Sequence, residues 1–314
     1  MTERIEATKA LYIKLGEGGK WEPSCIERDN TIRLGYEEAP HELCLQGKWE
    51  EITEVAVREW TKDRGAARRH ANQIRLFYEA GSDVLWITFY KGLLWWCRSK
   101  REVSVLEEDK SRTRPVIGRW RSDDLAGNVL QASRLSGKLL MLQGFRGTIC
   151  DVRERGYLLR KLNGTAEREV QDAKDALDSL VDKIKTIIHG LHWKDFELLV
   201  DLIFTNAGWQ RTSPLGETQK TLDLTLEAPI LGEQYGVQVK SQADLKAFKG
   251  YDEQVREWPG FKRFYFVVHT PSDDLEKLAE QMTSEDKVVI LGPRQLAKWS
   301  VRYGLVDWII DKAG

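Results

Sequence analysis

The second half of the chain constrains the fold most, because segments with a helical period alternate there with short runs of apolar and β-branched residues. Two strands that carry Asp223 and Lys240 lie among these segments. Helices are expected at residues 193–208, near 243–258, at 273–282 and from Pro293 onward, and buried strands at 263–270 and 287–292. Helices alternating with apolar strands are typical of a sheet covered on both faces. The pattern predicts a compact α/β domain.

The first half, residues 11–152, has a different pattern of short strands and turns. The run DVLWITFYKGLLWWCRS, residues 83–99, contains two aromatic-rich stretches joined by Lys-Gly, which predicts a β-hairpin. The run KLLMLQGFRGTICDV, residues 138–152, predicts a second strand pair interrupted by two glycines. Between the early strands, residues 50–80 have a helical period with a break at Gly65. The pattern predicts a strand-rich, barrel-like α+β domain.

One long amphipathic helix is predicted between the two halves, at residues 165–188. Acidic residues in its first turn suit the positive end of the helix dipole. Its apolar stripe consists of Val170, Ala173, Leu177, Leu180, Val181, Ile184, Ile187 and Ile188. We expect three parts: a strand-rich domain (1–160), a connecting helix (161–190) and an α/β domain (191–314). The stripe is expected to pack on its own chain, with dimerisation as the alternative.

Four polar residues follow one another in a set order in the α/β domain. Glu197 lies on the first helix, Asp223 lies on a β-branched run, and Gln238 and Lys240 lie in VQVKS on the next strand. Residues i and i+2 of a strand point to the same face, so Gln238 and Lys240 are expected to share a site. Each residue taken alone also fits an ordinary turn, an exposed face or a surface ion pair. The order of the whole set is the informative feature.

This order, with the run NAGW after the first helix, resembles the restriction-endonuclease-like nucleases of the PD-(D/E)xK superfamily, in particular the Mrr-like branch. The resemblance covers residues 191–305. It implies a restriction-endonuclease-like α/β fold for the C-terminal domain. It also implies a Mg²⁺-dependent or Mn²⁺-dependent site, because a cation held by oxygen ligands both activates water and stabilises the charge that develops on a phosphodiester.

The resemblance assigns a role to each residue of the catalytic set. Asp223, the side-chain oxygen of Gln238 and the carbonyl of Val239 would bind the cation. Lys240 would orient the attacking water and neutralise phosphate charge. Glu197 would reach the metal shell or a metal-bound water.

The sequence departs from the family pattern in two places. Thr221 and Leu222 precede Asp223 where the family has a proline, and Gln238 replaces the acid of ExK. The second departure leaves fewer negative charges to hold a hard cation. Weak metal affinity, or a non-catalytic nucleic-acid-binding module, therefore stays open.

Tryptophans and two basic stretches are concentrated in the strand-rich domain. Arginines in KDRGAARRHANQIR and RTRPVIGRWR are predicted to contact phosphates, and aromatic faces to stack on an unstacked base. The candidate nucleic-acid-binding residues are Arg64, Arg68, Arg69, Arg112, Arg114, Arg119, Trp21, Trp95 and Trp96. For each basic stretch a solvated face is the alternative, and for any single tryptophan a place in the core is the simpler expectation.

The runs LYIKLGEGGKWEPSCI, FYKGLLWWC and GFRGT resemble the small PUA or EVE-like barrels that read modified bases. Together the two resemblances imply a reader domain joined by a helix to a nuclease. We therefore predict a metal-dependent DNA endonuclease of the restriction type. It would be modification-dependent and would cut phage or foreign DNA, with modified cytosine as the candidate target. An RNA-directed nuclease is a further alternative.

Duplex DNA is the expected partner, and cutting both strands with one active site per chain favours a homodimer. The four cysteines are scattered and form no CxxC, which indicates neither a disulfide framework nor a zinc site. Nothing near Met1 resembles a signal peptide, and no apolar run is long enough to span a membrane. A cytoplasmic protein with reduced thiols is expected.

Overall fold

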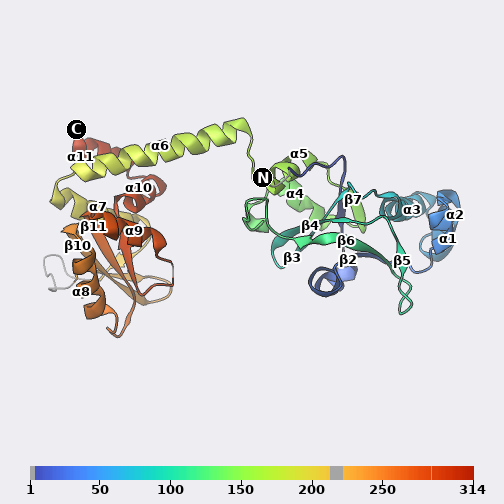
Figure 1. Ribbon diagram of the computed structural model, residues 1–314, viewed down its shortest axis with the longest axis horizontal. Helices are drawn as coiled ribbons and strands as arrows, with labels where there is room; N and C mark the ends of the chain where they lie inside the picture. The colour runs from blue at the N-terminus through green and yellow to red at the C-terminus, as the bar shows by residue number, and fades with distance from the viewer. Residues whose placement is uncertain (1–3, 213–221, 284) are drawn as a thin grey trace. The chain divides into compact units, whose positions relative to one another are not determined.

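The computed structural model describes residues 4–212, 222–283 and 285–314. The chain forms two compact units, Met1–Arg168 and Glu169–Gly314, shown in Figure 1. Among the described residues, no helix combines the length and the apolar character needed to cross a membrane.

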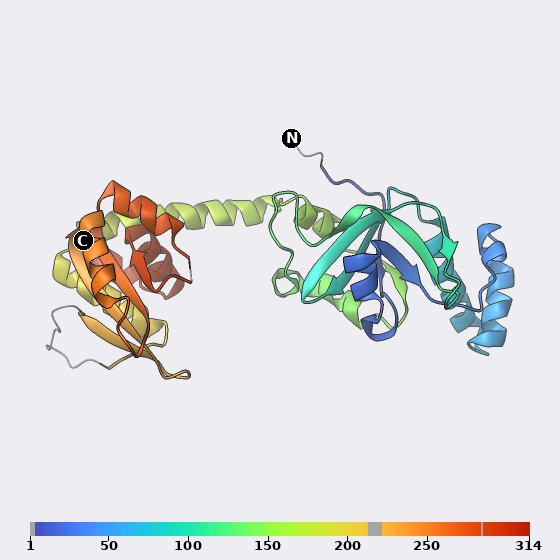
Figure 2. The same ribbon diagram turned by 60° about the horizontal axis from the view of Figure 1, so that its bottom comes forward.

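The first unit is built on one seven-stranded sheet in the order β2-β6-β4-β3-β1-β7, with β5 paired to β6. Its strands are β1 (Ala10–Ile13), β2 (Thr31–Leu34), β3 (Leu85–Tyr90), β4 (Leu93–Ser99), β5 (Ser104–Val105), β6 (Arg112–Arg121) and β7 (Ile149–Asp151). Most neighbours are antiparallel, and β1 and β3 are parallel. Figure 2 shows the strong curl of this sheet. No ladder joins β2 to β7 in the described part of the chain, so the sheet is an open half-barrel.

Helices and short helical turns cover this sheet. They are η1 (Glu17–Gly19), η2 (Ser24–Arg28), α1 (His41–Leu45), α2 (Trp49–Glu59), α3 (Arg64–Glu79), η3 (Ala132–Arg134), α4 (Gly137–Leu140), η4 (Met141–Gly144) and α5 (Arg155–Leu162). The predicted helical break falls before Gly65, because Asp63 caps α3 by accepting the N–H of Ala66. Gly65 itself lies in the first turn of α3.

The predicted hairpin is confirmed. Tyr90 pairs with Leu93, and Lys91 and Gly92 between them both have positive φ, at 50° and 72°. Two successive positive φ angles match the right-handed twist of the strands that such a turn connects. The strand pair predicted at residues 138–152 is wrong in its first half, where α4 and η4 form instead. Ser136 caps α4 by accepting the N–H of Leu139, and only β7 forms a strand.

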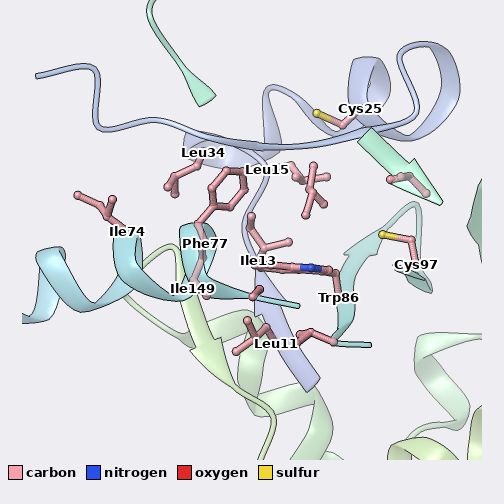
Figure 3. Close-up of a cluster of buried hydrophobic side chains, with 14 of the residues drawn as sticks. Leu11, Ile13, Leu15, Cys25, Leu34, Ile74, Phe77, Trp86, Cys97 and Ile149 are labelled. Carbon is pink, nitrogen blue, oxygen red and sulfur yellow. The ribbon is translucent and has the colours of Figure 1, made fainter. Parts of the chain in front are cut away.

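Both faces of the first sheet carry apolar cores. One core joins strand residues to α3, and Figure 3 shows Phe77 of α3 and Trp86 of β3 meeting there, with ring centroids 5.9 Å apart. The other core packs Tyr12, Leu85 and Trp96 against the helices that follow β6. Trp86, Trp96 and Trp120 are all buried. Many of the tryptophans of this unit therefore serve packing, which agrees with the expectation that any single tryptophan lies in the core.

The second unit contains a five-stranded sheet in the order β12-β11-β10-β9-β8. The strands are β8 (Gln210–Arg211), β9 (Leu224–Ala228), β10 (Glu233–Ala243), β11 (Phe261–Pro271) and β12 (Val288–Leu291). Strands β10, β11 and β12 are parallel, whereas β9 is antiparallel to both β10 and β8. Thr221, where the first predicted strand of this sheet begins, lies outside the described residues.

Six helices of the described chain belong to this unit: α6 (Arg168–Gly190), α7 (Trp193–Asn206), α8 (Leu245–Val255), α9 (Asp273–Gln281), α10 (Pro293–Arg302) and α11 (Val306–Ala313). One core packs α6, α7, α10 and α11 on one face of the sheet, and another packs α8 and α9 on the opposite face. The predicted two-sided cover is confirmed. The final helix is split at Gly304, whose φ is 72°.

The predicted long helix is α6. Its C-terminal part is anchored in the second unit, because Val181, Ile184 and Ile188 are buried in that core. The stripe continues toward the N-terminus of the helix through Val170 and Leu177, which are 48% and 50% exposed. The buried part packs on its own chain, in line with the first expectation.

Candidate functional site

The β9–β10 hairpin brings the candidate catalytic residues together. Strand register pairs Leu224 with Val237, and one further step places Asp223 opposite Gln238. The backbone N–H of Asp223 donates to the carbonyl of Val237 at 2.9 Å, which fixes this juxtaposition. Strand β9 begins only at Leu224, so β10 runs on past Asp223 without a β9 partner. The candidate site lies at the point where the two strands part.

The side chain of Asp223 is held by two donors from β10. Its Oδ2 atom accepts the backbone N–H of Val239 at 2.6 Å and the side-chain amide of Gln238. Within a strand, the N–H and C=O of one residue point toward the same neighbour. The Val239 carbonyl therefore faces the same strand edge as the Asp223 carboxylate. The side-chain nitrogen of Gln238 lies 3.4 Å from the carbonyl oxygen of Val239.

Lys240 and Glu197 reach the site from different elements. Both side chains line one pocket of about 370 Å³, whose walls are Trp193, Phe196, Glu197, Val239, Lys240 and Ser241. Gln238 is buried at 5% exposure, whereas Lys240 two residues later is exposed. Trp193, at the start of α7, is a half-exposed aromatic wall of this pocket at 49% exposure. The sequence interpretation had not singled it out.

The electrostatics of the site come from two neighbouring carboxylates. The pKa of Glu197 is raised, first by burial and then by the negative charge of Asp223, while Lys194 acts in the opposite direction. Repulsion between two carboxylates is relieved when a cation binds between them. Carboxylate, amide and backbone carbonyl oxygens are the donors that Mg²⁺ and Mn²⁺ accept, so the residues present fit such an ion.

The proposed ligands nevertheless include few negatively charged groups. Among the described residues, no three Asp, Glu, His or Cys side chains gather into a metal-binding group. A cation here would depend on the Gln238 amide and the Val239 carbonyl in addition to Asp223 and Glu197. His189 and His192 do not line this pocket, and His192 caps α7 by accepting the N–H of Lys194.

The raised pKa of Glu197 predicts a pH-dependent effect of Glu197→Gln on the metal-free protein. The folded state binds this proton more tightly than the unfolded state, so the repulsion is fully present above the folded pKa and is lost as pH falls toward the ordinary value of 4.5. We expect Glu197→Gln to raise the melting temperature at about pH 7 and to leave it unchanged below the ordinary glutamate pKa.

Melting curves in EDTA at the two pH values measure this effect. Glu253→Gln, which neutralises an exposed glutamate of α8, is the control and should change neither melting temperature. Equal melting temperatures of wild type and Glu197→Gln at both pH values would contradict the inferred repulsion.

A second candidate site is a pocket of about 430 Å³ in the first unit. Three separate segments form it, and its residues are Lys14, Gly16, Glu17, Gly18, Lys20, Trp21, Gly35, Tyr36, Glu37, Arg146, Gly147 and Thr148. It combines two aromatic side chains with three cationic ones. Only Trp21 was among the sequence predictions. The other residues come from segments far apart in the chain, and no local motif marks them.

The walls of this pocket are conformationally demanding. Tyr36 has a φ of 66°, a left-handed conformation that a bulky residue rarely adopts, and such strain is most frequent at functional sites. A Cβ on Gly147 would lie 2.6 Å from Oε1 of Gln73, so the backbone approaches α3 as closely as only glycine permits. The hydroxyl of Tyr36 is hydrogen-bonded to Nδ1 of His70 at 3.0 Å. Helix α3 therefore supports the pocket.

The predicted nucleic-acid-binding residues divide into accessible and buried groups. Arg64, Arg68 and Arg69 are exposed on α3, and Arg119 is exposed on β6. Arg64 is paired with Glu54 at 2.7 Å. Trp21 is half-buried, with the Arg33 guanidinium 4.4 Å and the Lys20 ammonium 4.8 Å from its ring centroid. These residues stay candidates for contact with nucleic acid.

The prediction is wrong for Arg112 and Arg114, which are 2% and 0% exposed. The Arg112 guanidinium donates to the carbonyls of Tyr36, Ala39 and Lys110, and Arg114 donates to those of Phe77, Ala80 and Lys100. Backbone carbonyls occupy these donors, so neither side chain can reach a phosphate. The stretch is rich in arginine, which suggested a phosphate-binding surface. Alternate residues of β6 point inward, however, and linear composition cannot show this.

The structure also corrects the prediction for Trp96 and limits that for Trp95. Trp96 is 8% exposed, and its indole N–H donates to the carbonyl of Asp123. Trp95 packs against the first core, with its N–H on the carbonyl of Tyr90 at 3.1 Å. Both indoles are used for packing and backbone contacts. At 8% exposure, little of the Trp96 ring is accessible to a base.

No protein-family model matches the chain, and no curated protein matches it. Among solved structures, the chain is similar to the DNA modification-dependent restriction endonuclease AspBHI, at 12% identity and a TM-score of 0.27, over 96% of this chain and 84% of that one. It is also similar to the MspJI restriction endonuclease in complex with a 27-mer oligonucleotide, at 12% identity and a TM-score of 0.22, over 79% of this chain and 70% of that one. Likenesses of this size carry no argument about function, which rests on the chain's own residues.

Proposed function

We propose that this chain is a metal-dependent DNA endonuclease of the restriction type, with a cutting site in the second unit and a base-reading site in the first. One observation carries the proposal. Asp223, Gln238 and the Val239 carbonyl share one strand edge, and Glu197 and Lys240 line a pocket beside them. Oxygen donors beside an exposed ammonium are the groups that phosphodiester hydrolysis needs.

Each residue has a proposed part in the reaction. Asp223 would hold the cation together with the Gln238 and Val239 oxygens. Glu197 would add a second negative charge that reaches the metal shell or a metal-bound water. When bound, Mg²⁺ or Mn²⁺ supplies Lewis-acid stabilisation and lowers the pKa of water. The exposed ammonium of Lys240 neutralises charge on the scissile phosphate and orients the water that attacks it.

The pocket around Trp21 and Tyr36 is the proposed reading site. Its volume of about 430 Å³ suits a small ligand, and aromatic walls stack on bases. Lys14, Lys20 and Arg146 line the same pocket and offer positive charge for phosphates. We propose that it takes an extruded modified base from duplex DNA, with modified cytosine as the first candidate. Two copies of the chain would supply the two active sites needed to cut both strands.

A second candidate function is nucleic-acid binding without cleavage. The absence of a three-carboxylate cluster among the described residues favours it, because a lean donor set binds Mg²⁺ weakly. This alternative predicts salt-dependent DNA binding with no cut strands at any metal concentration.

The discriminating experiment offers the purified protein four substrates in Mg²⁺ and in Mn²⁺: an unmodified duplex, a matched duplex with modified cytosine, single-stranded DNA and single-stranded RNA. The proposal expects cut strands from the modified duplex alone. Binding without cutting would favour the second candidate, and preferential cutting of RNA would identify an RNA-directed nuclease.

The reading site yields a prediction of its own. Trp21→Ala should remove one aromatic wall, and loss of a stacked base costs about 1–3 kcal/mol, so affinity for the modified duplex should fall by roughly 5-fold to 150-fold. Affinity for the unmodified duplex should change far less. Fluorescence anisotropy on the two matched duplexes measures both values.

Trp49→Ala is the matched control, since Trp49 lies on α2 and bonds Glu79 instead of lining the pocket. It should preserve the preference for modified DNA. Equal losses of affinity on both duplexes after Trp21→Ala would argue against this pocket as the reading site.

A further inference from the structure

Tyr251 is a buried residue beside the candidate active site that none of the proposed chemistry uses. It lies on α8 and is 6% exposed, in the core that α8 and α9 form with the second sheet. Its ring centroid lies 5.0 Å from that of Phe266, and Phe266 is the β11 neighbour of Gln238. The phenol therefore packs on the face of the sheet to which Gln238 points.

The hydroxyl of Tyr251 is fully buried and has no hydrogen-bond partner among the described residues. A buried donor without an acceptor lowers stability, and phenylalanine would fill the same space without that cost. Burial, and then the charge of Asp223, raise the pKa of Tyr251, so the group stays a neutral O–H donor at physiological pH.

The hydrogen bonds of Asp223 indicate when this donor would be needed. Its Oδ2 atom now accepts the amide N–H of Gln238. If Gln238 is to offer its oxygen to a cation, the amide has to turn, and Asp223 loses one of its donors. A neutral buried hydroxyl nearby can take the place of that N–H without adding charge to the site.

We propose that Tyr251 is a positioning residue whose hydroxyl donates to the Asp223 carboxylate when the site is loaded with a divalent cation. The inference rests on the cation site of the proposed function. It explains why the core keeps a hydroxyl where the metal-free fold gains nothing from it. Groups that orient ligands in this way commonly change metal affinity by about 10-fold to 100-fold when removed.

Tyr251→Phe tests the proposal, with Tyr265→Phe as the matched control. Tyr265 is also a buried tyrosine. It lies on β11 and belongs to the core on the opposite face of the sheet, with its ring centroid 5.4 Å from that of Phe204. Mn²⁺ affinity is measured by electron paramagnetic resonance, and melting temperature in EDTA is measured beside it.

We expect Tyr251→Phe to weaken Mn²⁺ binding about tenfold or more without lowering the metal-free melting temperature. Tyr265→Phe should leave Mn²⁺ affinity unchanged. Unchanged Mn²⁺ affinity in Tyr251→Phe would overturn this proposal alone, provided Asp223→Ala abolishes binding. A wild-type protein that binds no Mn²⁺ would overturn the cation site as well.

Discussion

Lys240→Ala is expected to lower the single-turnover rate of cleavage by about 10²-fold to 10³-fold, the usual cost of removing one group that stabilises transition-state charge. The reason is electrostatic, because Lys240 is the positively charged side chain among the described residues that line the Glu197 pocket. The side chain is exposed, so its truncation should leave the fold intact. Rates are measured by quenched-flow on end-labelled modified duplex at saturating protein.

Lys246→Ala is the control for this result. Lys246 is an exposed lysine of α8 outside the pocket, so its loss removes the same charge without touching the site. Its cleavage rate should stay close to that of wild type. A wild-type rate in Lys240→Ala, with normal DNA binding, would remove Lys240 from the chemistry. Lys240 is a cleaner target than Asp223, whose carboxylate also fixes the backbone of Val239.

Arg114→Met is expected to lower the free energy of unfolding by about 3 kcal/mol or more, because it leaves buried carbonyls without a donor. Arg114 bonds the carbonyls of Phe77 and Ala80, at the C-terminal end of α3, and that of Lys100. Terminal carbonyls have no partner within a helix, and the helix dipole favours a cation there. Burial lowers the pKa of Arg114 to about 10, which still leaves it charged at neutral pH.

Urea unfolding of Arg114→Met and of Arg119→Met gives the comparison. Arg119 lies on the same strand with an exposed side chain, so the same substitution there should change stability by no more than about 0.5 kcal/mol. Equal effects of the two substitutions would contradict a capping role for Arg114. Both variants should be assayed for DNA binding below the unfolding transition.

Local patterns in the sequence were sufficient for much of the fold. The Lys-Gly turn between two aromatic runs gave the β3–β4 hairpin, and alternation of helical and apolar segments gave the two-sided sheet of the second unit. These features follow from short-range chemistry. The run from residue 138 was misread as a strand because its leucines suit either structure, and the Ser136 cap decides for a helix.

The two candidate sites differ in the same way, since one could be predicted from local sequence and the other could not. Asp223, Gln238 and Lys240 could be proposed from sequence because their order resembles that of a known nuclease family, and strand periodicity places the last two on one face. The Trp21 pocket could not, since it is assembled from segments as distant as Lys14 and Arg146. The burial of Arg114 depends on α3 closing over β6, and the position of Tyr251 depends on sheet register. Such facts arise from tertiary packing and are absent from any local window.

The central claim is that the Asp223 site cuts DNA when it holds a divalent cation. The most direct measurement is a metal add-back assay on the purified protein and a modified duplex, first in EDTA and then with excess Mg²⁺ or Mn²⁺. The account predicts intact DNA in EDTA, cut strands after the metal is added, and no cut strands from Asp223→Ala under either condition. Bound but intact duplex at every metal concentration would contradict it and would identify the chain as a module that recognises nucleic acid without cutting it.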